Sequence, residues 1–167
     1  MTGPIVVLVG PPGAGKSTVG QLVAQRLGVA FRDTDADIVA AEGKPISDIF
    51  YDEGEPRFRA METLAVSRAM AEHDGVLALG GGAVLSAGAR EELAGRTVVF
   101  LDVGMAAAAR RVGLARDRPV LTLNPRAMLH ALLAERRPLY EQVATHTVET
   151  DGRTPEEVAD AVLEAIR

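Results

Sequence analysis

A glycine-rich loop near the N-terminus constrains this chain more than any other feature. Residues 10–17 have the sequence GPPGAGKS and fit the pattern G-x-x-x-x-G-K-[ST]. They follow an apolar run at 5–9, which is typical of a buried parallel strand, and precede a helical pattern at 17–27 that Gly28 ends. Glycines let successive backbone N–H groups point at phosphate oxygens, so this unit predicts binding of a nucleoside triphosphate.

Two side chains of the loop carry specific chemistry. Lys16 supplies a cation near the β and γ phosphates, and the Ser17 hydroxyl is a suitable ligand for Mg²⁺. The alternative is a Gly/Pro turn that matches by chance, and the strand before the loop and the helix after it disfavour this. We therefore expect a nucleotide phosphate site with a magnesium ion.

Composition narrows the class of partner. The 167 residues have the size of one domain, and the net charge is −5, with arginines interleaved with acids. Without a basic stripe, neither nucleic acid nor a membrane surface is an expected partner. The chain has no cysteine, which excludes disulfides and thiolate nucleophiles. No apolar run approaches the ~20 residues of a membrane span, and no signal peptide is visible. We expect a cytoplasmic monomer that acts on small molecules.

Five short strand candidates alternate with helical patterns. They lie at residues 5–9, 30–33, 76–79, 97–102 and 146–150. Because parallel strands need crossover connections, this alternation predicts an α/β fold with a parallel sheet and helices on both faces. Thr154 to Glu157 is a capping box that begins the last helix. Residues 113–125 do not fit this alternation of strands and helices. They contain two prolines, three charges and no clear periodicity of apolar residues, which is typical of a mobile connection or lid.

Three aspartates, Asp33, Asp35 and Asp37, follow the second predicted strand. They fall at the carboxyl edge of the sheet, where open α/β folds bind ligands. Phosphoryl transfer to an alcohol needs a carboxylate near Mg²⁺ and another that accepts the hydroxyl proton, which Asp33 and Asp35 could supply. The alternative is an acidic cap on a helix at 36–42. Spacing leaves both interpretations open for these two, and Asp37 is interpreted as a cap.

Gly80, Gly81 and Gly82 follow the third predicted strand at the same edge. Their backbone N–H groups can form a nest that binds an oxyanion or a substrate hydroxyl at close approach. The alternative is a tight turn between strand and helix, although such a turn needs only one glycine.

Arginine is abundant, so a single arginine carries little weight. Arg59 lies on the inner part of a long helical pattern, where a charge on a part-buried face needs a partner. Arg118 lies in the predicted lid. Arg136 and Arg137 precede Pro138, where the helix is expected to end, and their alternative role is compensation of the helix dipole.

Taken together, these residues resemble the shikimate kinase family, small P-loop kinases of the nucleoside-monophosphate-kinase type. The resemblance covers nearly the whole chain, and its motifs occur in order. They are the loop 10–17, Asp33-Thr34-Asp35, Ile46 with Asp48-Ile49-Phe50, Gly54-Glu55, Phe58-Arg59 with Glu62, residues 80–83, Arg118-Pro119, and Arg136 with Pro138 and Tyr140. Neighbouring sugar-acid kinases share the loop but lack the combination of Asp-Thr-Asp, Phe-Arg and Gly-Gly-Gly.

The resemblance implies transfer of the γ-phosphoryl group of ATP to the 3-hydroxyl of shikimate, a step of chorismate and aromatic amino-acid biosynthesis. It also implies a single P-loop kinase domain with a five-stranded parallel sheet in the order 2-3-1-4-5. Within this domain, a substrate-binding helical region is expected at about residues 34–62 and a lid at about residues 113–125.

The resemblance also assigns roles on the ATP side. The residues that contact ATP are Gly13, Ala14, Gly15, Lys16, Ser17, Thr18, Arg111, Arg118 and Pro155. Among them, Arg118 closes over the transferring phosphoryl group, and Arg111 and Pro155 flank the adenine. By its residues alone, Arg111 fits a solvated helix face as well. Ser17 ligates Mg²⁺, and Asp33 lies near the metal through water.

On the shikimate side, the residues implied by the resemblance are Asp35, Arg59, Gly80, Gly81, Gly82 and Arg136. Asp35 orients or deprotonates the acceptor hydroxyl, and with Lys16 and Arg118 it forms the expected catalytic set. Arg59 and Arg136 bind the carboxylate, for which a planar guanidinium is well suited. The three glycines contact the substrate hydroxyls.

The chain departs from the family pattern at two points. Residues 118–121 are Arg-Pro-Val-Leu where Arg-Pro-Leu-Leu is commoner, and the lid is short. The third strand lacks the acid of an ordinary Walker B strand, so Asp33 must help to hold the metal. Two other functions compete: a kinase for gluconate or a nucleotide, and an inactive nucleotide-binding module. The arginine pair with the glycine nest disfavours the first, and the acceptor base Asp35 disfavours the second.

Overall fold

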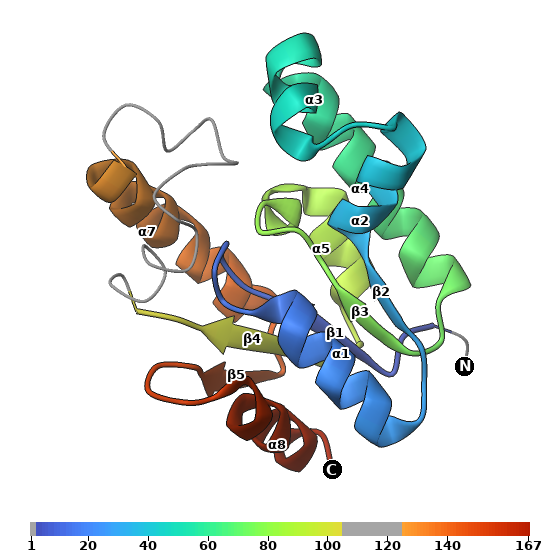
Figure 1. The fold of residues 1–167 in the computed structure, drawn as a ribbon, viewed down its shortest axis with the longest axis vertical. Coiled ribbons are helices and arrows are strands. Elements are labelled where there is room, and N and C mark those ends of the chain that lie inside the picture. The colour runs from blue at the N-terminus through green and yellow to red at the C-terminus, as the bar shows by residue number, and fades with distance from the viewer. Residues whose placement is uncertain (1–2, 105–124) are drawn as a thin grey trace.

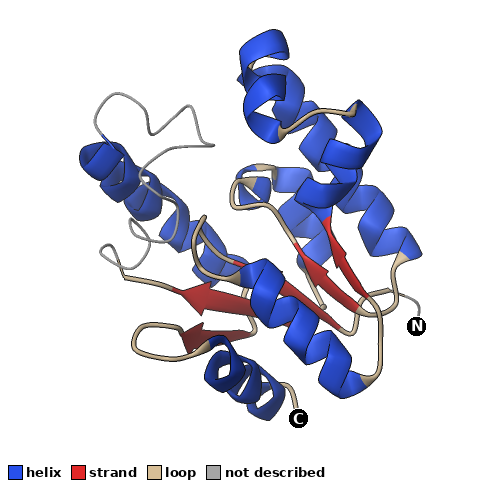
Figure 2. Ribbon diagram, in the orientation of Figure 1, coloured by secondary structure: helices blue, strands red, loops and turns tan. Residues whose placement is uncertain are grey.

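The computed structural model describes residues 3–104 and 125–167. Its five parallel strands form one sheet in the order β2-β3-β1-β4-β5. They are β1 (Val6–Val9), β2 (Phe31–Asp33), β3 (Val76–Ala78), β4 (Val98–Asp102) and β5 (His146–Glu149). Helices flank the sheet on both faces (Figures 1 and 2). The α/β class, the parallel sheet and the strand order are confirmed, and every strand lies within one residue of its predicted bounds.

The helices of the described residues connect and cover these strands. They are α1 (Lys16–Leu27), α2 (Thr34–Glu42), α3 (Ile46–Glu53), α4 (Glu55–Glu72), α5 (Ala87–Leu93), α7 (Pro125–Val143) and α8 (Pro155–Ala165), with a 3₁₀ turn η1 (Ala83–Leu85). Gly28, in the left-handed conformation at φ 70°, ends α1 as predicted. The predicted capping box of Thr154 and Glu157 begins α8.

The start of α2 differs from the prediction. The helix begins at Thr34, two residues early, because the Asp33 side chain accepts from the backbone N–H groups of Asp35 and Ala36. The interpretation of Asp37 as a cap was wrong. Its carboxylate accepts instead from the Arg32 Nε, 2.6 Å away, in an ion pair on the outer side of the helix.

The expected helix end before Pro138 was also wrong, because α7 continues through this proline. Proline removes one backbone hydrogen bond from a helix interior. Beyond it, however, Tyr140 is buried and stacks on Phe100 of β4 with 5.1 Å between ring centroids. This packing stabilises the last turns of α7. Arg136 therefore lies well inside the helix, too far from its end to compensate the helix dipole.

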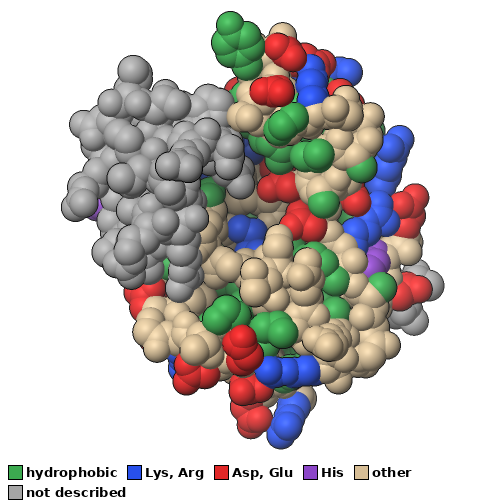
Figure 3. Space-filling view, viewed as in Figure 1, with side chains coloured by type: hydrophobic (Ala, Val, Ile, Leu, Met, Phe, Trp, Pro, Cys, Tyr) green, Lys and Arg blue, Asp and Glu red, His purple; other side chains and the backbone are tan. Residues whose placement is uncertain are grey.

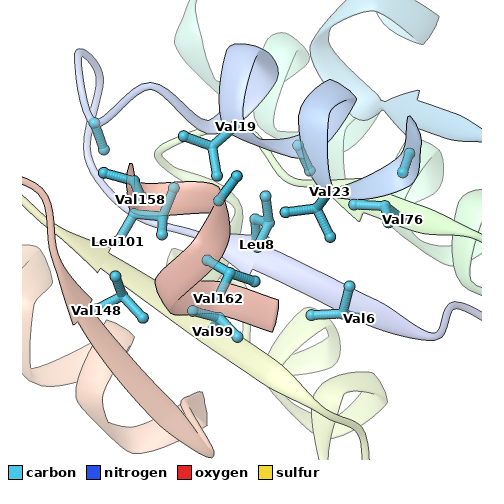
Figure 4. Packing of buried hydrophobic residues seen from close by; sticks show 14 of the residues in the cluster. Val6, Leu8, Val19, Val23, Val76, Val99, Leu101, Val148, Val158 and Val162 are labelled. Atoms are coloured by element: carbon cyan, nitrogen blue, oxygen red, sulfur yellow. The ribbon is translucent and has the colours of Figure 1, made fainter. Parts of the chain in front are cut away.

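Two clusters of apolar side chains fill the space between the sheet and its helices. Because side chains alternate along a strand, Leu8 of β1 faces α1 and α8, whereas Val7 faces α4, α5 and α7. Figure 4 shows the first cluster, with Val23 of α1 and Val162 of α8 pointing toward the strands. The sheet is thus the middle layer of three.

The helices α2, α3 and α4 carry a third, separate cluster. Ile38, Ile49 and Phe58 are buried against one another, and the rings of Phe50 and Phe58 lie 4.8 Å apart. The helices α2 and α3 stand beyond the carboxyl edge of the sheet, whereas α4 continues from this cluster along the face of the sheet (Figure 1). They span most of the region at about residues 34–62 that was predicted to bind substrate.

Strand register brings the expected functional segments to one edge. Asp33 of β2 lies opposite Ala78 of β3, and Val9 of β1 lies opposite Phe100 of β4. The segments that follow these strands therefore meet at the carboxyl edge of the sheet. Among the helices that the structure describes, none is long and apolar enough to cross a membrane.

Candidate active site

A cavity of about 480 Å³ opens at the carboxyl edge of the sheet, beside the glycine-rich loop. Its lining includes Gly13, Ala14, Gly15, Lys16, Ser17, Thr18, Asp33, Asp35, Thr150, Arg153 and Pro155. Figure 3 shows the hollow, with a basic side chain in its depth and acidic side chains beside it. All six loop residues predicted to contact ATP thus line one space.

The loop itself is shaped for phosphate. Gly15 caps α1 in the left-handed conformation at φ 86°, which a side chain would strain. The Lys16 Nζ donates to the carbonyl oxygens of Gly10 and Pro11 at 2.8 and 3.0 Å. The cation is therefore held over the loop, where phosphate oxygens would meet backbone N–H groups and the helix N-terminus.

Ser17 and Asp33 provide two oxygens for a hard cation. The Ser17 Oγ donates to the Asp33 Oδ2 at 2.5 Å, so loop and second strand meet here. The other carboxylate oxygen, Oδ1, accepts from the Asp35 backbone N–H at 2.8 Å and caps α2. The sequence left open whether Asp33 caps a helix or serves the metal site. The two roles are compatible, because Oδ1 caps α2 and Oδ2 faces Ser17. Oxygen donors of this kind fit Mg²⁺, which usually keeps several waters.

Asp35 lies against the glycine segment 80–82. A Cβ atom placed on Gly80 would be 2.5 Å from the Asp35 Oδ1 and 2.8 Å from the Glu62 Oε2. The Gly80 N–H donates to the Thr34 Oγ1 at 3.1 Å. A side chain at position 80 would have to displace the ends of both carboxylates. Because the Gly80 N–H is bound to Thr34, it is not free for the predicted nest, which stays a prediction for the N–H groups of Gly81 and Gly82.

Arg59 is fixed from several sides. Its Nη1 donates to the Glu62 Oε1 at 2.8 Å, and its Nη2 lies 3.3 Å from the Glu55 Oε2. The guanidinium carbon also lies 5.3 Å from the centre of the Phe58 ring. A Cβ on Gly82 would clash with the guanidinium group. The predicted need of Arg59 for a partner is therefore met, and the third glycine leaves room for it.

Glu62 is a buried carboxylate beside these groups. Burial raises the pKa of Glu62, and the neighbouring Asp35 charge acts in the same direction, whereas Arg59 and Arg136 lower it. A buried charge is stable only with partners, and here the arginines supply them. The electrostatic state of Glu62 is thus coupled to both arginines that were predicted to bind a carboxylate.

Arg136 approaches the site from α7 and is buried, with 7% of its surface exposed. Burial raises the pKa of Tyr140, one helical turn further along, and the charge of Arg136 acts in the opposite direction. The Tyr140 hydroxyl donates to the Gly81 carbonyl oxygen at 2.6 Å. This bond connects α7 to the glycine segment that lies beside Asp35.

Buried polar residues are rare in the described part of the chain, and all of them lie at this edge. They are Thr34, Glu62, Arg136 and Thr150. Thr34 binds the glycine segment, and Thr150 lines the phosphate cavity. Because burial of a polar group costs free energy unless it is partnered, their concentration here marks a built site rather than ordinary core.

The far end of the cavity lies at the start of α8. Thr150, Arg153, Pro155 and Val158 line this part of the cavity, and the adenine contact expected of Pro155 stays a prediction. The structure does not test the roles predicted for Arg111, Arg118 and the lid at 113–125. Both arginines, and the lid up to residue 124, lie outside the described residues.

Three residues of the site received no role from the sequence. Glu62 was noted as part of a motif, and its position three residues after Arg59 on a helix could have revealed the pairing. Arg153 precedes Pro155 by two residues, and this proximity to a predicted ATP contact could have indicated that Arg153 lines the same cavity. Tyr140 gave none, because its partner Gly81 is distant in the sequence.

The comparisons with known proteins agree with this geometry. A family model described as shikimate kinase matches residues 12–167. A shikimate kinase of Streptomyces avermitilis is 61% identical over 166 residues, which is 99% of this chain and 97% of that protein. The solved structure of shikimate kinase from Acinetobacter baumannii in complex with shikimate has a TM-score of 0.93 and 38% identity, covering 99% of this chain and 93% of its own.

A more distant likeness is informative about the fold. A gluconokinase from Sinorhizobium meliloti has a TM-score of 0.59 and 22% identity, and covers 96% of this chain and 90% of its own. At that identity the likeness extends to the fold alone.

Proposed function

The chain belongs to the shikimate kinase family, and we propose that it transfers the γ-phosphoryl group of ATP to the 3-hydroxyl of shikimate. This is a step of chorismate and aromatic amino-acid biosynthesis. One observation carries the proposal beyond nucleotide binding. Asp35 lines the phosphate cavity and also lies against Gly80, next to the carboxylate that holds Arg59. A potential proton acceptor thus stands between the phosphate loop and an arginine pair.

The arginine pair accounts for recognition of the acceptor. Arg59 and Arg136 present guanidinium groups from two different helices, and guanidinium forks bind carboxylates with two parallel hydrogen bonds. The glycine segment 80–82 would contact the ring hydroxyls through the N–H groups of Gly81 and Gly82, because the Gly80 N–H already donates to Thr34. An acceptor with one carboxylate and several hydroxyls matches this set better than a nucleotide does.

The transfer step uses few groups. Asp35 accepts the proton of the acceptor hydroxyl, whose oxygen forms a bond to the γ-phosphorus while the bond from that phosphorus to the bridging oxygen of ADP breaks. Lys16 stabilises the negative charge that the phosphate oxygens develop. The products are ADP and the phosphate monoester, with the proton on Asp35.

Ser17 and Asp33 would hold the Mg²⁺ that neutralises the phosphate charges. Asp33 keeps its orientation because its second oxygen is bound by the start of α2. On the same family basis we assign Arg118 to the transferring phosphoryl group, and Arg111 with Pro155 to the adenine. The segment at 113–125 is assigned as the lid.

An acceptor panel tests the proposed function. Release of ADP is measured in a coupled assay with shikimate, gluconate or AMP as acceptor, and Lys16→Ala serves as the matched inactive control. We expect turnover with shikimate alone, and a loss of at least about 10²-fold in the control, because a preorganised charge is removed. Turnover with gluconate or AMP instead would assign a different acceptor. ATP binding without turnover on any acceptor would assign an inactive module.

We also propose that the chain acts as a monomer in the cytoplasm, where ATP is available. Size-exclusion chromatography with light scattering tests the oligomeric state, and a stable dimer would contradict this part of the proposal.

A further inference from the structure

The turn between β5 and α8 forms one wall of the phosphate cavity. Thr150 and Arg153 of this turn, with Pro155 at the start of α8, line the cavity. Asp151 lies between them in the sequence and is not part of the described lining. The Arg153 backbone N–H donates to the Thr150 carbonyl oxygen at 3.2 Å and closes the turn, in which Gly152 has a left-handed φ of 72°. The position of the wall therefore depends on where this turn is attached to the sheet.

Two links attach the turn to the end of β4. The pairing of β4 with β5 ends at Asp102 and Glu149. Directly after it, the buried Thr150 donates to the Asp102 carbonyl oxygen from its backbone N–H and from its hydroxyl, each at 2.9 Å. Next, the Gly104 backbone N–H donates to both carboxylate oxygens of Asp151, each at 3.0 Å. The second link therefore extends the attachment beyond the last residue of β4.

Gly104 leaves the space that this carboxylate occupies. A Cβ atom placed on Gly104 would lie 2.5 Å from the Asp151 Oδ2. Gly104 does not have a positive φ, so its backbone conformation does not itself require a glycine. A side chain at position 104 would disturb the approach of the carboxylate rather than the course of the chain.

We propose that Asp151 is a positioning residue, which holds this wall of the cavity against the end of β4 through its contact with Gly104. The adenine contact proposed for Pro155 follows in the same segment, so the attachment of the turn sets where the nucleotide meets the wall. Asp151 thereby contributes to ATP affinity without touching ATP. The proposal rests on ATP as the phosphoryl donor of the function proposed above.

The charge of Asp151 and its hydrogen bonds have opposite effects on nucleotide binding. ATP is anionic, so a carboxylate near its site repels it, and removal of the charge alone would raise the affinity. The hydrogen bonds restrict the turn before the nucleotide arrives. Without them, the turn must be ordered when ATP binds, and that ordering lowers the affinity. The sign of the change in affinity therefore shows which effect dominates.

Two variants of Asp151 separate these effects. Asp151→Ala removes both acceptor oxygens, whereas Asp151→Asn removes the charge and keeps one of them. We expect the KM for ATP to rise about three- to tenfold in Asp151→Ala and to stay within about twofold in Asp151→Asn, with kcat and the KM for shikimate unchanged in both. The matched control is Asp74→Ala, because the Asp74 carboxylate accepts from the Gly3 backbone N–H at 3.3 Å, before the start of β3. This control should leave the KM for ATP unchanged.

A double-mutant cycle tests the contact from its other side. Gly104→Ala places a methyl group against the Asp151 carboxylate, so it should raise the KM for ATP as Asp151→Ala does. The double variant should match Asp151→Ala alone, because the methyl group then meets no carboxylate. Multiplicative effects, or a KM for ATP in Asp151→Ala that is lowered or equal to wild type, would overturn the positioning role. Titration calorimetry of the wild-type protein with ADP is the reference: no binding there would overturn the proposed function itself.

Discussion

In the proposed mechanism, Asp35 is the residue on which the chemistry of the transfer depends. Asp35→Asn keeps the shape of the side chain but removes the charge and the proton acceptor. We expect kcat to fall roughly 10² to 10⁴-fold with ATP affinity retained, as steady-state kinetics and a nucleotide-binding titration would measure. The control Asp37→Asn makes the same change at a carboxylate that pairs with Arg32, and should leave kcat unaltered. Collapse of ATP affinity in Asp35→Asn would instead place Asp35 in the metal site.

Arg136 and its neighbour Arg137 offer a matched pair for testing the carboxylate clamp. Arg136→Lys preserves the charge and loses the fork, so we expect kcat/KM for shikimate to fall roughly tenfold or more with little change for ATP. Arg137 is half-exposed and forms two 2.7 Å hydrogen bonds with Asp102, away from the glycine segment. Arg137→Lys should therefore leave the KM for shikimate unchanged, and the reverse pattern would place the clamp at Arg137.

Glu62 gives the site a pH-dependent effect on stability. Burial raises its pKa above the ordinary value of 4.5, so the folded state binds the proton more tightly than the unfolded state does. The contribution of this group is then present at low pH and is lost as pH rises through the folded pKa. In denaturant titrations, the free energy of unfolding of wild type minus that of Glu62→Gln should fall as pH rises from 4.5. A difference that rises with pH would mean that pairing with Arg59 outweighs burial.

At the scale of the element, α8 depends on its first turn. The Thr154 hydroxyl accepts from the Glu157 backbone N–H at 3.1 Å, and the Glu157 carboxylate accepts from the Thr154 backbone N–H at 2.8 Å. Thr154→Ala breaks this box, and we expect the melting temperature to fall by roughly 2–6 °C. The KM for shikimate should not change, because α8 lies on the opposite face of the sheet from α4 and α7. An unchanged melting temperature would mean that packing alone fixes this helix.

The elements also show how far sequence patterns reach. Short runs between turn residues predicted all five strands. Four of these strands contain β-branched residues, whereas β2 has none and is only part-buried. The end of α7 was mispredicted at Pro138, since the packing of Tyr140 on Phe100 is not visible in a local window. Sequence motifs were enough to predict that the glycine-rich loop, Asp33 and Asp35 lie at one site. The hydrogen bond from Tyr140 to Gly81 was not predictable, because it joins residues that are distant in the sequence.

At the scale of the whole molecule, the helical region that was predicted to bind substrate has a hydrophobic cluster separate from the main core. Leu8→Ala opens a cavity in the main core and should lower the free energy of unfolding by about 2–5 kcal/mol across the fold. Ile49→Ala removes an equally buried side chain from the separate cluster of α2, α3 and α4. We expect hydrogen exchange to accelerate in those helices first, with a raised KM for shikimate and slow exchange retained in the sheet. Uniform acceleration in Ile49→Ala would show that both cores unfold together.

The glycines of segment 80–82 have a consequence for anyone who mutates this chain at random. A Cβ added at position 80 would lie 2.5 and 2.8 Å from the Asp35 and Glu62 carboxylates, and one at position 82 would clash with the Arg59 guanidinium group. Even alanine therefore displaces the end of a neighbouring charged side chain. A pool of variants selected for growth should therefore be depleted of every substitution at these two codons. At Gly43, where an added Cβ meets nothing within 4 Å, the only penalty is the positive φ of 73°. Sequencing such a library would show which glycine positions accept no side chain. Those positions would mark the proposed substrate site.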